Sequence, residues 1–132
     1  MMTREQRIVA CLQDALPREA PALKALRARA LDLPAMLRRH GLMHVLLFLA
    51  GKQGSDRELA DFLYQGIGAA LGEELMAPDV RRYAESLAGL DLPLYLLHGE
   101  AAQESAAWLK LLVEARTRVT ATPPAPVEEM AT

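Results

Sequence analysis

The stretch LMHVLLFLA, from Leu42 to Ala50, is the longest apolar run of the chain. A helix over these residues would be apolar on almost every side, so we expect it at the centre of the fold. The run is far shorter than the ~20 residues that a membrane-spanning helix needs. The charged N-terminal sequence MMTREQR is not followed by an apolar signal region. We therefore expect a cytoplasmic protein that does not contact a membrane.

Helical patterns precede this run. Residues 3–16, 21–33 and 34–40 have the apolar spacing of helices, and Thr3 and Gln6 predict a capping box for the first of them. The proline that begins the third segment is expected to restart or kink the chain. The triplet Arg38–His40 would complement the helix dipole before a glycine.

Three more helices are expected after the run, over residues 55–71, 79–88 and 91–119. The first is expected to begin with a capping box at Ser55–Glu58, and the other two with aspartate caps. Two glycines lie inside it, at positions 66 and 68, and each costs about 1 kcal/mol against alanine unless a neighbouring helix approaches closely. The inward stripe expected in the last helix is Leu94, Leu97, Ala101, Ser105, Trp108, Leu112, Ala115 and Val119.

These patterns and the bulk composition agree on the fold class. The chain has 132 residues, 52% of them hydrophobic and 5% aromatic, which fits one domain and disfavours a sheet. We expect an all-α protein, a compact bundle of about six helices with a long C-terminal helix. Residues 1–119 would form the single domain. Residues 120–132, TATPPAPVEEMAT, would be a disordered or extended tail rich in Pro, Ala and Thr.

The charge is unevenly divided although the formal net charge is only −2. Residues 1–52 hold nine Lys/Arg and four Asp/Glu, whereas residues 53–132 hold six and thirteen. This division suggests one basic and one acidic face, suited to head-to-tail contacts or to a polyanion on one side. Ordinary solvated surface explains such blocks about equally well.

No catalytic or metal-binding motif stands out. Cys11 is a single cysteine, which excludes an internal disulfide and is best read as a small buried residue. His40 and His44 are four apart, but the glycine between them favours a capping and a helical histidine over a zinc site. His98 and Glu100 are read as surface residues, and no phosphate-binding glycine loop or nucleophile elbow is present. We expect a protein that is not an enzyme and holds no metal or cofactor.

The basic residues of the first half are the candidate site. No aromatic residue is interleaved with the cations of residues 24–39, so base stacking is not expected to dominate. Contacts to RNA would instead be to the phosphate backbone and independent of sequence. The candidates are Lys24, Arg27, Arg29, Arg38, Arg39 and Lys52.

Two segments resemble a known family. Residues 33–42 read LPAMLRRHGL and lead into the apolar run, and residues 95–115 begin with Tyr-Leu and contain WLK at 108–110. Together they resemble the small subunit of the Cmr complex, the RNA-targeting effector of type III-B CRISPR antiviral defence. The resemblance covers about residues 20–118.

The resemblance implies a small α-helical subunit that is not a nuclease. Copies of it would stack as a filament beside the other Cmr subunits and help hold the duplex of guide RNA and target RNA by its phosphates. Family members often carry a basic residue after the WLK lysine, where this chain has Leu111. The basic surface near Lys110 is therefore expected to be weaker, or to be supplied by Arg116 and Arg118.

Two alternatives remain open at this point. The related Csm complex has a helical small subunit with a similar part. Trp108 and the near-heptad stripe of the last helix also suit a helical protein–protein interaction module without RNA. An enzyme of an unrecognised type is the least favoured hypothesis.

Overall fold

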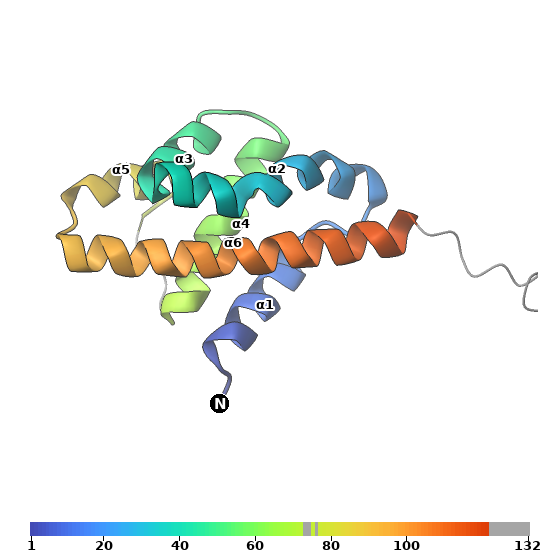
Figure 1. The fold of residues 1–132 in the computed structure, drawn as a ribbon, viewed down its shortest axis with the longest axis horizontal. Coiled ribbons are helices and arrows are strands. Elements are labelled where there is room, and N and C mark those ends of the chain that lie inside the picture. The colour runs from blue at the N-terminus through green and yellow to red at the C-terminus, as the bar shows by residue number, and fades with distance from the viewer. Residues whose placement is uncertain (73–74, 76, 122–132) are drawn as a thin grey trace, which may run out of the picture.

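The structure is a computed structural model that describes residues 1–72, 75 and 77–121. Within these residues it contains α-helices and one 3₁₀ turn, and no strand (Figure 1). The predicted all-α class and the long C-terminal helix are confirmed. The elements are α1 (Arg4–Ala15), α2 (Ala20–His40), α3 (Leu42–Ala50), α4 (Ser55–Leu71), α5 (Val80–Ser86), η1 (Leu87–Gly89) and α6 (Leu92–Ala121).

Helix α4 is the centre of the bundle, because it contacts α1, α2, α3, α5 and α6. Helix α6 runs the length of the molecule with α2 alongside it (Figure 1). The expectation that Leu42–Ala50 forms the central helix is wrong. One side of α3 packs inward, but Leu47 and Phe48 on its other side are 42% and 39% exposed.

Helix α2 continues through Pro34 instead of restarting there (Figure 1). Proline in a helix interior removes one backbone hydrogen bond and costs about 3 kcal/mol. Burial of a stripe that extends on both sides of Pro34 offsets this cost. The stripe consists of Leu23, Leu26, Ala30, Leu33 and Leu37.

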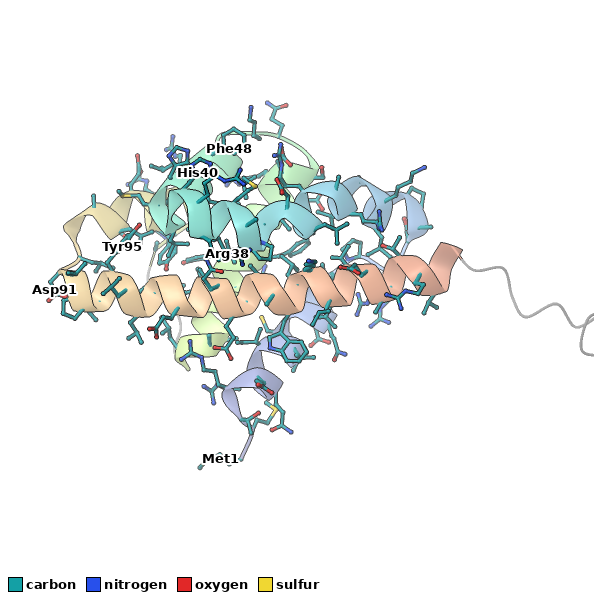
Figure 2. All side chains as sticks on the ribbon, in the orientation of Figure 1. Met1, Arg38, His40, Phe48, Asp91 and Tyr95 are labelled. Carbon is teal, nitrogen blue, oxygen red and sulfur yellow. The ribbon has the colours of Figure 1, made fainter. Side chains whose placement is uncertain are left out.

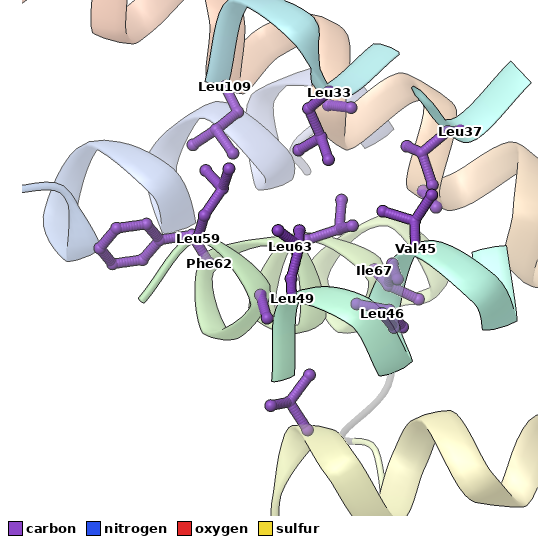
Figure 3. Packing of buried hydrophobic residues seen from close by; sticks show 14 of the residues in the cluster. Leu33, Leu37, Val45, Leu46, Leu49, Leu59, Phe62, Leu63, Ile67 and Leu109 are labelled. Atoms are coloured by element: carbon purple, nitrogen blue, oxygen red, sulfur yellow. The ribbon is translucent and has the colours of Figure 1, made fainter. Parts of the chain in front are cut away.

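The hydrophobic core lies where α2, α3, α4 and α6 face one another (Figure 3). Branched aliphatic side chains dominate it, and most are fully buried. The core side chains labelled in Figure 3 are Leu33, Leu37, Val45, Leu46, Leu49, Leu59, Phe62, Leu63, Ile67 and Leu109.

Helix α6 buries a stripe of mostly small residues: Ala101, Ala102, Ser105, Ala106, Leu109 and Val113. The predicted stripe was therefore right at Ala101 and Ser105 but rotated elsewhere. Leu94, Leu97 and Val119 are exposed, and Trp108 is a half-buried side chain packed on the core. The buried stripe differs from the predicted one because small residues line the closest approach of α6 to α4, at Ser105.

Gly66 of α4 and Ser105 of α6 mark the closest approach of these two helices. A Cβ atom on Gly66 would lie 2.8 Å from both Cβ and Oγ of Ser105. The close helix contact expected for a glycine inside α4 is therefore confirmed at Gly66. A side chain there would force the helices apart.

The caps of α1, α5 and α6 are those expected from the sequence. Thr3 and Gln6 form a complete capping box, in which the Gln6 backbone amide donates to Thr3 Oγ1 and the Thr3 backbone amide donates to Gln6 Oε1. Asp79 accepts from the Arg82 amide, and Asp91 from the Leu94 amide. The box expected at Ser55–Glu58 is wrong, because Gly54, with a φ of 70°, is the cap residue and Ser55 already lies in α4.

The end of α6 also differs from expectation. The helix continues to Ala121, two residues into the segment expected to form the tail. The remaining tail residues, 122–132, lie outside the described part of the chain.

We predict that Gly66→Ala destabilises the protein by about 1–3 kcal/mol, because the overlap with Ser105 exceeds the ~1 kcal/mol that alanine gains in a helix. Urea unfolding measures the change. Gly99→Ala in α6 is the matched control, since a Cβ there meets nothing within 4 Å and should stabilise the helix. An equal rise in stability in both variants would show that the α4–α6 contact is not tight.

Candidate nucleic-acid interface

Four of the predicted basic residues share the outer face of α2. Lys24, Arg27, Arg38 and Arg39 are all exposed. At 3.6 residues per turn they fall within an arc of about 120° on the side away from the buried leucines. The helix rise of 1.5 Å per residue spreads them over roughly 20 Å. The structure thus places these cations on one helix face as two pairs about 16 Å apart, Lys24 with Arg27 and Arg38 with Arg39. We call this surface the α2 basic face.

The α2 basic face ends, at Arg38 and Arg39, next to the corner between α2 and α3. Gly41 has a φ of 86°, a left-handed conformation that favours glycine. Its backbone amide donates a hydrogen bond to the Leu37 carbonyl at 2.9 Å. The Met43 amide at the start of α3 donates to the Tyr95 hydroxyl of α6 at 3.2 Å. Figure 2 shows Tyr95 and Arg38 near this corner. The two sequence segments that resemble the Cmr small subunit therefore meet in space.

His40 and His44 stack on each other across the corner. Their ring centroids are 4.8 Å apart and their planes differ by 18°. A metal ion binds an imidazole in the plane of its ring, so a parallel stack does not chelate one ion well. Among the described residues no three or more His, Cys, Asp or Glu side chains are grouped as metal ligands.

Arg29 and Lys52 lie apart from the α2 basic face. Arg29 Nε and Nη2 are 3.2 Å and 3.4 Å from the two carboxylate oxygens of Asp56, and its guanidinium lies 5.4 Å from the centroid of the Phe48 ring. Lys52 Nζ lies 4.9 Å from the same centroid. The expectation that no aromatic residue accompanies the cations is wrong, because the Phe48 ring lies close to both Arg29 and Lys52. The position of Phe48 between Arg39 and Lys52 in the sequence was the available signal.

Arg116, on α6, forms hydrogen bonds with the C-terminal end of α1. Its guanidinium donates to the carbonyls of Gln13 at 2.6 Å and Leu16 at 2.9 Å, which lie at the C-terminus of that helix. Arg7 serves α4 in the same way, donating to Ala69 and Ala70 at 3.0 Å and 3.2 Å. Both guanidinium groups satisfy carbonyls that helix ends leave without partners.

The other two predicted cations of α6 differ in exposure. Lys110 is half-buried, while Arg118 is exposed near the end of the helix. Leu111, which follows Lys110, is 54% exposed. The structure therefore does not join the cations of α6 into one row.

The remaining candidate chemical groups lie in structural contacts. His98 Nδ1 is 2.6 Å from the hydroxyl of Tyr83, and burial raises the pKa of Tyr83 well above its usual value. Burial, and then the charge of Asp14, raises the pKa of the half-buried Cys11 thiol. A thiol with a raised pKa is a poor nucleophile. These groups do not form a nucleophile–base pair.

An apolar end of α6 is a second surface that the sequence did not identify. Its first turns expose Leu92 (67%), Leu94 (46%), Leu96 (55%) and Leu97 (42%) on several sides of the helix. Exposed apolar clusters of this kind mark contacts with other molecules. The run LPLYLL at residues 92–97 contains these leucines, but its apolar spacing is equally typical of a buried helix. We call these four residues the α6 leucine end.

A basic helix face and an apolar helix end define a small helical subunit of the kind that works inside an assembly. The chain belongs to the Cas_Cmr5 family of CRISPR-associated proteins, whose family model matches residues 3–116. This membership confirms the resemblance and decides between the Cmr and Csm small subunits. None of the helices in the described residues is long and apolar enough to cross a membrane.

The fold is also similar to that of a solved relative. The crystal structure of a CRISPR-associated Cmr5 family protein from Thermus thermophilus matches with a TM-score of 0.65 and 24% sequence identity. The match covers 86% of this chain and 95% of that one, so the two share the fold over nearly their whole length. No curated protein sequence matches the chain.

We predict that Arg116→Ala lowers the free energy of unfolding by about 1–3 kcal/mol, because it leaves helix-end carbonyls without a charged donor. Lys24→Ala, which truncates an exposed cation of α2, is the matched control and should change stability by less than about 0.5 kcal/mol. Thermal or urea unfolding of the two variants makes the comparison. Full stability of Arg116→Ala would argue against the capping role.

Proposed function

We propose that the chain is the non-catalytic small subunit of a type III-B CRISPR effector complex. In this role its copies stack as a filament and hold the duplex of guide RNA and target RNA by phosphate contacts that do not depend on sequence. Family membership supports the place in a Cmr complex. The observation that carries the RNA contact is the α2 basic face, on which four exposed cations lie in two pairs. Such a subunit would work in the cytoplasm.

The charge balance explains why stacking matters for this function. The whole chain carries a net charge of −2, so an isolated copy attracts RNA weakly. Copies that align their α2 basic faces would present a continuous row of cations to one duplex. Several weak contacts on one ligand give a high overall affinity through effective concentration.

The α6 leucine end supports the protein contacts of this proposal. Leucines exposed around the first turns of a helix are costly in water and are expected to be buried against another subunit. Either a neighbouring copy or another Cmr subunit would supply that surface. The contact lies at one end of α6, and Figure 1 shows that α2 runs beside this helix. Leu96 lines the same pocket as Arg38, so a partner there would lie beside the Arg38 end of the α2 basic face and leave its Lys24 end open to RNA.

The α6 leucine end also favours a second candidate function, a helical protein–protein interaction module without RNA. Purification of the tagged chain from its native host separates the two functions. Guide RNA together with Cmr subunits supports the effector role, while a protein partner free of RNA supports the interaction module.

The absence of catalysis is a prediction of its own. The purified chain should cleave neither RNA nor DNA, with or without divalent metal, because its Tyr83, His98 and Cys11 lie in structural contacts. Gel assays with labelled strands measure this. Metal-dependent cleavage that persists through repurification and disappears in a His40 or His44 variant would contradict it.

We predict that Arg38→Ala with Arg39→Ala weakens binding of target RNA by the assembled complex about equally for all sequences. It should also reduce the slope of log affinity against log salt by roughly one unit for each lost phosphate contact in each subunit. Folding should be nearly unchanged, since both side chains are exposed. Salt titrations of binding provide the measurement.

The matched control is Arg81→Ala with Arg82→Ala, which removes the same charge from an exposed pair on α5. This variant should leave the salt slope unchanged. If both double variants lowered the slope equally, general charge and not the α2 basic face would attract RNA. If the Arg38/Arg39 variant failed to enter the complex, these arginines would serve assembly.

A further inference from the structure

Phe48 is the exposed aromatic residue around which two cations gather. It lies on the outer side of α3, away from α6 (Figure 2), with 39% of its surface exposed. Arg29 comes from α2 and Lys52 from the residues just after α3, and both lie over the ring, at 5.4 Å and 4.9 Å from its centroid. We call these three residues the Phe48 cluster.

The two cations of the cluster have different constraints. Arg29 is held by Asp56 through two hydrogen bonds, which also neutralise its charge. Lys52 is exposed and forms no ion pair with the described residues. A lysine side chain is flexible and is readily moved from an aromatic face, since a cation–π contact in water is worth only about 0.5–1 kcal/mol. The cluster therefore combines a fixed cation, an exposed ring and a movable positive charge.

These are the parts of a site that binds an unpaired nucleotide. Every base has an aromatic face that stacks on a phenyl ring, and a neighbouring cation pairs with the adjacent phosphate. Bases inside a duplex are already stacked on one another, so the ring is open only to a base that has left the helix. Arg29 belongs to the same helix as the α2 basic face but lies outside its arc, so the cluster is a separate surface of the molecule.

We infer that the Phe48 cluster binds an unpaired base of the RNA held by this subunit, with the base on the Phe48 ring and Lys52 turned to the adjoining phosphate. The inference rests on the proposed RNA-holding function and adds a second kind of contact to it. The α2 basic face holds paired regions by phosphates, and the Phe48 cluster takes a base displaced from the pairing. Arg29 stays on Asp56 and supports the ring from the α2 side.

The test uses the complex assembled with this chain and two guide–target RNA duplexes, one fully paired and one with a single unpaired 2-aminopurine ribonucleotide. Phe48→Ala should weaken binding of the second duplex roughly 10-fold or more, as loss of one stacked base does, and leave the first unchanged. Phe48→Trp should retain the binding and the stacking-induced quenching of 2-aminopurine fluorescence. Leu47→Ala, which truncates the neighbouring exposed residue of α3, is the matched control and should change neither.

Several results would overturn the inference. Equal weakening of both duplexes by Phe48→Ala, or no weakening of either, would exclude base stacking. Loss of the Phe48→Ala subunit from the complex would assign the cluster to a protein partner. Binding of the paired duplex tests the phosphate contacts of the α2 basic face, whereas fluorescence of the unpaired base tests Phe48. The two measurements therefore distinguish a failure of the proposed function from a failure of this inference.

Discussion

The contact between Gly66 of α4 and Ser105 of α6 is the constraint on which the rest of the bundle depends. It allows the small residues of α6 to lie directly on the central helix, with no room for an added Cβ. With α6 packed against α4 in this way, Tyr95 of α6 contacts the start of α3. The buried stripe of α2 faces the core, so the opposite side of α2 faces solvent. The exposure of the α2 basic face is thus a consequence of close helix packing.

Several arginines stabilise the fold through contacts with other helices, and this separates them from the exposed cations of α2. Arg7 and Arg116 donate to the last carbonyls of α4 and α1, and Arg29 is paired with Asp56. These groups stabilise the fold with charge that composition alone would assign to a binding surface. The exposed cations of α2 do not take part in such contacts within the described residues. In the proposed function, the α2 basic face would attract RNA although the chain is acidic overall.

Local features of the fold could be predicted from the sequence, whereas contacts between distant segments could not. The capping box at Thr3 and the cap at Asp79 depend on residues three apart, and both are present. Pro34 continues a helix because packing outweighs propensity, and Ser55 is displaced from its expected role by a glycine turn at residue 54. The α2 basic face follows from helical period once the buried side of α2 is known. Nothing local indicates that Phe48 meets Arg29, or that Arg116 serves α1.

The most direct test of the central claim is an electron cryo-microscopy structure of the Cmr complex assembled with this chain, guide RNA and target RNA. We expect Lys24, Arg27, Arg38 and Arg39 of successive copies to face the phosphates of one duplex, with the α6 leucine end buried against a neighbouring subunit. A map in which the outer face of α2 packs against protein, or points away from the RNA, would contradict the proposed function.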